Sequence, residues 1–137
     1  MADLSNIELL RRGFEIYERE GAEGLLPLAD PEIEIYTQPG LMNAGTDRGH
    51  EGFLRWSEQW LEAWEEFRIE PKEFIEVGGS IVVVPIRQAA TGRGSGVRVG
   101  NDITYLVEIR GGKVTRFHVY QETEGALEAA KRLAAEP

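Results

Sequence analysis

The chain has 137 residues, of which 24 are acidic and 15 are basic, so its formal net charge is −9 at pH 7. The basic residues are scattered along it and form no stripe, which argues against nucleic acid as a partner. The sequence contains no cysteine, which excludes a disulfide, a cysteine-ligated metal and a thiol nucleophile. We expect one domain, residues 1–137, that is large enough to bury its own core.

No stretch of the sequence approaches the roughly eighteen apolar residues that a membrane span requires. The N-terminal residues also lack the basic region and apolar run of a secretory signal. We therefore expect a cytoplasmic protein with no membrane partner. With only two histidines and no cysteine, we expect no metal site, and nothing in the sequence indicates a cofactor.

The first part of the chain predicts two helical segments and a strand. Ser5 and Glu8 have the form of a capping box, and the apolar residues after them recur at helical spacing, which predicts a helix over residues 5–20. A short helical turn over residues 22–28 follows. Asp30 then opens a short strand.

The segment 49–67 is predicted to be the most distinctive helix, because it carries four large aromatic residues at spacings of three and four: Phe53, Trp56, Trp60 and Trp64. Such a stripe is more often plain core than a ligand-binding surface. Its bulk nevertheless favours gaps between helix and sheet that side chains do not fill. Both interpretations stay open, as does the role of the preceding loop, residues 36–48, as a lid or as a flexible surface excursion.

The second half of the chain is predicted to consist mainly of strands. An interrupted strand over residues 69–77 precedes three long strands over residues 80–121, where apolar and polar residues alternate and glycines mark the turns. Thr123 stands where the N-cap of a final helix is expected. Helices segregated to one face of a largely antiparallel sheet make an α+β domain, in which residues 80–121 form the wall of a pocket.

Seven short segments follow one another in a distinctive order and spacing: Tyr17–Gly21, Ile33–Ile35 before a Pro-Gly loop, Arg48–Gly52, Phe67–Pro71, Thr91–Gly96, Arg110–Val114 and Glu124–Ala130. Together they resemble a SnoaL-like domain, the polyketide cyclase branch of the fold shared by ketosteroid isomerase and nuclear transport factor 2. The resemblance spans nearly the whole chain. No single segment is specific, so the order and spacing carry it.

The resemblance implies a cone-shaped, curved, mainly antiparallel sheet, cystatin-like and nuclear transport factor 2-like, wrapped around the N-terminal helices. It also implies an apolar conical pocket for a small hydrophobic molecule, although a shared fold does not fix a function. The residues that we expect to line this pocket are Phe14, Tyr17, Tyr36, Phe53, Trp56, Trp60, Phe117, Val119 and Gln121.

The catalytic positions of the family are only partly present. The resemblance places the three functional residues of ketosteroid isomerase at Phe14, at Ile35 and near Tyr105. A phenylalanine cannot donate to an oxyanion and an isoleucine cannot take a proton, so isomerase chemistry in that form is not expected. Tyr105 remains the candidate donor deep in the pocket. The strand that carries the cyclase aspartate in the family has no acidic residue in its expected inward set, Thr115, Phe117, Val119 and Gln121.

Three further residues are weaker catalytic candidates. Arg87 either emerges into solvent or anchors an anionic group of a ligand, and because side chains alternate along a strand, only one of Arg87 and Gln88 lines the pocket. Asp102 and His50 are expected at the rim, where His50 also suits the capping of a helix.

The outer face of the sheet is expected to pair with a second copy of the chain. Leu106, His118 and Tyr120 make a partly apolar surface that a monomer does not readily expose, which predicts a homodimer through this face. Glu34 and Glu108 are expected to point to solvent.

Two hypotheses of function follow. The first is a SnoaL-like domain that binds a small hydrophobic molecule in its cone, with or without isomerase, cyclase or hydrolase activity on a ketone- or polyketide-like substrate. The second is a non-catalytic module whose cone is filled by its own side chains and which acts by ligand binding or dimerisation. The absence of a deep base favours binding over catalysis.

Overall fold

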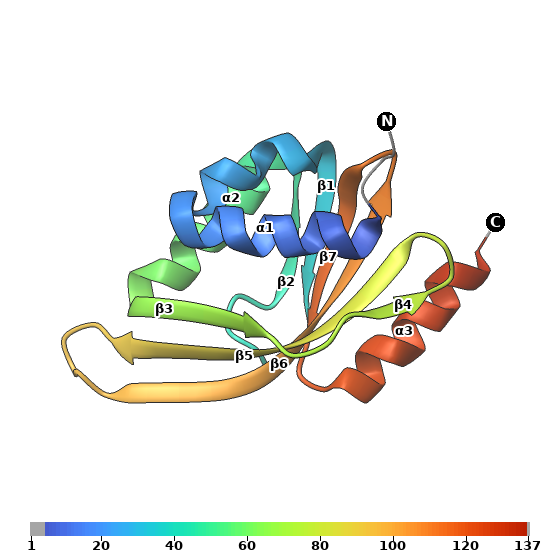
Figure 1. Ribbon diagram of the computed structural model, residues 1–137. Coiled ribbons are helices and arrows are strands. Elements are labelled where there is room, and N and C mark those ends of the chain that lie inside the picture. The colour runs from blue at the N-terminus through green and yellow to red at the C-terminus, as the bar shows by residue number, and fades with distance from the viewer. Residues whose placement is uncertain (1–4, 137) are drawn as a thin grey trace.

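The computed structural model describes residues 5–136. Figure 1 shows its elements, which are, in chain order, α1 (Asn6–Glu20), the 3₁₀ helix η1 (Ala22–Leu28), β1 (Ala29–Thr37), β2 (Gly45–Arg48), α2 (Gly49–Ala63), β3 (Trp64–Pro71), β4 (Ile75–Val77), β5 (Ile81–Gly92), β6 (Arg98–Arg110), β7 (Lys113–Tyr120) and α3 (Thr123–Ala135). The three long strands expected over residues 80–121 are confirmed as β5, β6 and β7. Within residues 5–136, the structure has no helix with both the length and the apolar character of a membrane span.

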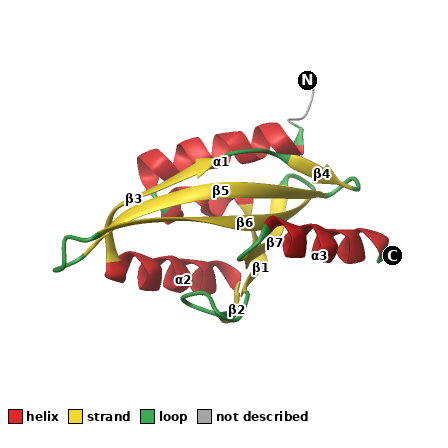
Figure 2. Cartoon of the chain, turned by 90° about the horizontal axis from the view of Figure 1, so that it is seen from below, coloured by secondary structure: helices red, strands yellow, loops and turns green. Residues whose placement is uncertain are grey.

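The strands form one curved sheet in the order β2-β1-β7-β6-β5-β3, with β4 paired to β5. β1 runs parallel to β7, and every other pairing is antiparallel. The helices α1 and α2 lie on one side of the sheet and α3 lies on the other (Figure 1). Figure 2 shows the same helices and strands from below. The predicted α+β fold class is confirmed, with α3 as an addition on the opposite face.

β5 is buried on both faces, which explains why its first half reads as an unbroken apolar run. Val82, Val84 and Ile86 pack on the α1 side with Tyr105. The alternate residues face α3, where the buried Leu106 contacts a set of small residues, Ala126, Ala129 and Ala130. The outward exposure expected for Leu106 was therefore wrong, because α3 covers it completely.

The tryptophan helix is shorter than the spacing of its aromatic residues predicts. α2 ends at Ala63, and Trp64 adopts extended backbone angles, φ −130° and ψ 149°. Trp64 instead begins β3, where it pairs with Gly92 of β5. The expected single stripe of three tryptophans was wrong, because pairing with the long strand β5 outweighs the helical spacing.

Two other boundaries differ from the expectation. β3 ends at Pro71, which has no N–H to continue the ladder, so the segment 69–77 is split between β3 and β4. The expected loop over residues 36–48 is reduced to residues 38–44, because β2 pairs with β1 in an antiparallel hairpin. Asn43 donates through Nδ2 to the Trp56 carbonyl at 3.2 Å, which ties this loop to α2.

Candidate functional site

A cavity of about 140 Å³ lies between the α1 and α2 helices and the sheet. Seven of the residues expected to line the pocket do line it: Phe14, Tyr17, Phe53, Trp56, Trp60, Phe117 and Val119. Trp56 and Phe117 meet edge to face with ring centroids 5.7 Å apart, yet the cavity persists beside them. The side chains of this chain therefore do not fill the cone.

Five polar side chains interrupt the apolar lining of the cavity: Tyr17, Thr37, Ser57, Gln88 and Tyr105. Trp56 donates through Nε1 to Thr37 Oγ1 at 3.0 Å, so this pair is satisfied within the protein. Among the described residues that line the cavity, none is charged and none is a histidine. The cavity therefore offers only neutral hydrogen-bonding groups.

Tyr105 is almost fully enclosed, with 5% of its surface exposed. Its ring lies between Phe117, at a centroid distance of 4.6 Å, and the nearly parallel ring of Phe14, at 6.4 Å. Burial raises the pKa of Tyr105 well above its ordinary value, and the neighbouring Tyr17 adds to this rise. Burial also raises the pKa of Tyr17, and the Ser57 hydroxyl offsets part of that rise. Both phenols are neutral hydrogen-bond donors at neutral pH.

Gln88, and not Arg87, faces the cavity. Gln88 is 5% exposed and lies in phase with Val84 and Ile86 on the inner face of β5. Arg87 points the other way, with its side chain 51% exposed and Nη1 at 3.5 Å from Asp102 Oδ1 on the neighbouring strand. The structure thus places the proposed anion anchor outside the cavity.

The two rim candidates also lie outside the cavity lining. Asp102 accepts from Lys72 Nζ at 2.8 Å, and this hydrogen bond is the main reason that the pKa of the carboxyl group lies below its ordinary value. His50 Nε2 lies 3.0 Å from the Ala29 carbonyl oxygen, a contact that holds the start of α2 against β1. Both residues have structural partners that account for their positions.

Two of the expected lining residues lie elsewhere. Tyr36 stands on the outer face of β1, where its ring packs against His118 at 5.4 Å and against Tyr120 at 6.0 Å. Strand alternation explains this, because the inner face of β1 carries the isoleucines of that strand. Gln121 lies just after β7 and donates through Nε2 to the Pro39 carbonyl at 3.2 Å, so it braces the loop after β1.

A bulge between β6 and β7 changes which residues of β7 face inward. Val114 lines the cavity, whereas Thr115 donates through Oγ1 to Glu108 Oε1 at 2.7 Å on the outer face. Glu108 is only 5% exposed, so the expectation that it points to solvent was wrong. Burial alone would raise the pKa of Glu108, but the Thr115 hydrogen bond and the charges of Arg116 and Arg110 outweigh it and lower this pKa.

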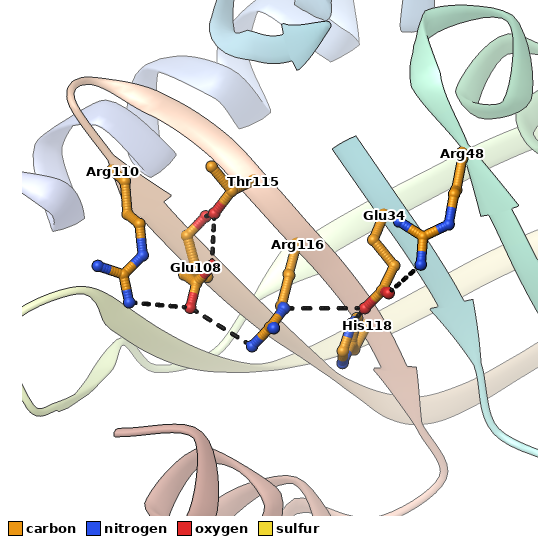
Figure 3. Close-up of polar contacts among 7 residues, drawn as sticks. All are labelled: Glu34, Arg48, Glu108, Arg110, Thr115, Arg116 and His118. Atoms are coloured by element: carbon orange, nitrogen blue, oxygen red, sulfur yellow. Dashed lines mark hydrogen bonds and ion pairs between the residues drawn. The ribbon is translucent and has the colours of Figure 1, made fainter. Parts of the chain in front are cut away.

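The outer face carries a connected polar network, shown in Figure 3. Glu34 accepts from Arg48 Nη2 at 3.0 Å, lies 2.8 Å from His118 Nε2, and forms a longer ion pair with Arg116 at 3.8 Å. Burial lowers the pKa of His118, although Glu34 acts in the opposite sense. The expected outward position of His118 is confirmed, and this network lies on the opposite side of the sheet from the cavity.

Sequence reasoning missed two polar residues of the cavity, Thr37 and Ser57, and left Gln88 open as the alternative to Arg87, although strand and helix periods carry a signal for each. Thr37 is in phase with the inward isoleucines of β1, Ser57 lies one turn after Phe53 on α2, and Gln88 continues the inner face of β5.

The comparisons with known proteins agree with this architecture. The model of the SnoaL-like domain family matches residues 10–117. The chain belongs to the SnoaL-like domain family. No curated protein matches the sequence significantly.

Solved structures of the same fold cover nearly the whole SnoaL-like domain. TerC, co-crystallised with polyporic acid, is 26% identical with a TM-score of 0.75, over 92% of this chain and 98% of TerC. An NTF2-like protein of unknown function from Burkholderia pseudomallei is 21% identical with a TM-score of 0.77, over 98% of this chain and 100% of that protein. A Jannaschia protein assigned as a SnoaL-like polyketide cyclase is 16% identical with a TM-score of 0.73, over the full length of both chains.

Proposed function

We propose that this SnoaL-like domain binds a small, mostly apolar molecule of about one ring that carries a hydrogen-bond acceptor such as a ketone carbonyl. The observation that carries the proposal is the cavity of about 140 Å³, whose lining is apolar apart from a few neutral polar groups. A buried apolar cavity of about 150 Å³ holds benzene. A molecule much larger than one substituted ring would have to extend through the mouth.

The neutral lining selects against charged ligands. A charged group would lose its hydration in the cavity without gaining a counter-ion among the described lining residues. A neutral carbonyl oxygen, in contrast, gains a hydrogen bond from Tyr105, whose high pKa keeps its proton in place. We therefore propose a neutral ligand whose hydrogen-bond acceptor is directed at the Tyr105 hydroxyl.

Binding is better supported than turnover. Isomerase, cyclase and hydrolase reactions each need a group that accepts a proton, and the described lining residues include no carboxylate and no imidazole. Tyr105 is able to polarise a bound carbonyl, but a proton acceptor would have to be the ligand itself or water. The co-crystallisation of TerC with polyporic acid supports the use of this fold for small molecules, and makes polyporic acid a useful additional probe.

We expect acetophenone to bind to the wild-type protein, to change its tryptophan emission and to raise its melting temperature by mass action. Tyr105→Phe should weaken acetophenone binding about two- to twelvefold, because one hydrogen bond contributes about 0.5–1.5 kcal/mol. Tyr120→Phe, on the outer face, is the matched control and should bind like the wild type. An unchanged dissociation constant in Tyr105→Phe would remove the role assigned to this hydroxyl.

We also propose that the chain forms a homodimer through the outer face of β1 and β7. Tyr36 and Tyr120 are partly buried there, and the charges of Glu34 and Arg116 already have partners (Figure 3). Burying this face therefore leaves few charges unpaired.

Sedimentation velocity at micromolar concentration should show that the wild-type protein is a dimer and that Tyr120→Glu is a monomer. Val99→Glu, on the exposed hairpin, is the control and should remain a dimer. A wild-type monomer under these conditions would refute the proposal.

A further inference from the structure

Gln88 is a buried amide without a side-chain partner among the residues that the structure describes. It is 5% exposed, lines the cavity, and forms no side-chain hydrogen bond with any residue between 5 and 136. Its nitrogen and oxygen are not among the fully enclosed unpaired atoms of the structure, so they keep access to the cavity. Its cross-strand neighbour on β3, Ile69, is apolar and also lines the cavity.

A glutamine at this position needs an explanation, because a buried amide without a hydrogen bond costs free energy. The two preceding residues on the same face of β5, Val84 and Ile86, are apolar and fully buried. A third apolar residue would fit the same surface without that cost. We therefore expect that the hydrogen-bond partner of this amide is a ligand in the cavity.

Gln88 lies at a different end of the cavity from Tyr105. In the β5–β6 ladder Tyr105 pairs with Val84, whereas Gln88 pairs with Asn101, four residues further along both strands. At about 3.4 Å per residue this separates their backbone positions by about 14 Å along the strands. A ligand that satisfies both side chains must therefore carry polar groups at two ends.

We propose that the ligand carries, opposite its carbonyl, a second group with a donor and an acceptor side by side, such as a carboxamide or a lactam. The amide of Gln88 presents one acceptor and two donors, and so it matches such a group with two hydrogen bonds at once. Gln88 is then the residue that selects this ligand class. This inference rests on the proposed function, since it assigns the second half of the same ligand.

The test compares two probes that differ only at one end of the ring, 4-acetylbenzamide and 4-methylacetophenone, by calorimetry and thermal shift. We expect the wild-type protein to bind 4-acetylbenzamide about tenfold more tightly. Gln88→Leu should abolish this preference while it binds 4-methylacetophenone at least as well as the wild type does. Gln59→Leu, on the exposed surface of α2, should keep the preference.

Stability without ligand separates recognition from a structural role. Gln88→Leu should melt at the wild-type temperature or higher, because it removes a buried unpaired amide. If Gln88→Leu fails to fold, Gln88→Met takes its place and shows whether the preference depends on the amide. If neither variant folds, Gln88 has a structural role and the inference is overturned. A preference that persists in a folded Gln88 variant, or its absence in the wild type, also overturns the inference. Failure of both probes to bind to the wild type overturns the proposed function itself.

Discussion

Replacing Leu106 by alanine is expected to lower the free energy of unfolding by about 2–5 kcal/mol. Leu106 is fully buried on the outer face of β6, where it contacts the small side chains of α3. Those alanines are short and lie on a helix whose position is set by the contact, so they cannot reach into the space that Leu106 leaves. Urea denaturation followed by circular dichroism measures the change.

Val99→Ala is the control for this substitution, because Val99 lies on the same strand and is 42% exposed. Its effect should stay within about 0.5 kcal/mol, as is usual for surface positions. If Leu106→Ala also changed stability by no more than this, α3 would not pack on the sheet as described. Leu106 would then be exposed on the outer face of β6, as the sequence alone predicts.

Replacing Val107 by phenylalanine is expected to weaken acetophenone binding by about tenfold or more, which corresponds to at least about 1.4 kcal/mol. Val107 is 2% exposed and lines the cavity on the same face of β6 as Tyr105. The larger ring would occupy space that the ligand needs. Because the cavity can accept the added volume, the variant should remain folded, which circular dichroism checks.

Val99→Phe makes the same change on the same strand outside the cavity, and it should bind acetophenone like the wild type. A folded Val107→Phe protein with an unchanged dissociation constant would place the binding site elsewhere. Weaker binding in both variants would instead indicate a general effect of the added ring on the protein.

The sheet could be predicted from the sequence because its signals are local. Alternation along residues 80–121 and the glycine turns define β5, β6 and β7 without reference to the rest of the chain. The end of α2 could not be predicted in the same way. Trp64 keeps the helical spacing of the preceding tryptophans, and only the pairing of Trp64 with Gly92 on a distant strand makes it part of β3.

The lining of the cavity could be predicted where the residue type alone indicates an apolar pocket. Large aromatic residues such as Trp56 and Trp60 belong in an apolar pocket, and both line the cavity. Alternation alone placed Arg87 and Gln88 on opposite faces, but it could not tell which face was inner, because α3 makes both faces of β5 apolar. Tyr36 was misplaced because its residue type suits a pocket, although the alternation of β1 puts it on the face opposite the isoleucines.

The most direct test of the central claim, that the cavity binds a small neutral ring, is an NMR titration of the wild-type protein with acetophenone. The three tryptophan indole N–H groups serve as reporters, because Trp56 and Trp60 line the cavity and Trp64 does not. We predict saturable shifts at Trp56 and Trp60, a smaller shift at Trp64, and a weaker apparent affinity in Tyr105→Phe. Indole signals that stay unchanged up to the solubility limit of acetophenone would contradict the claim.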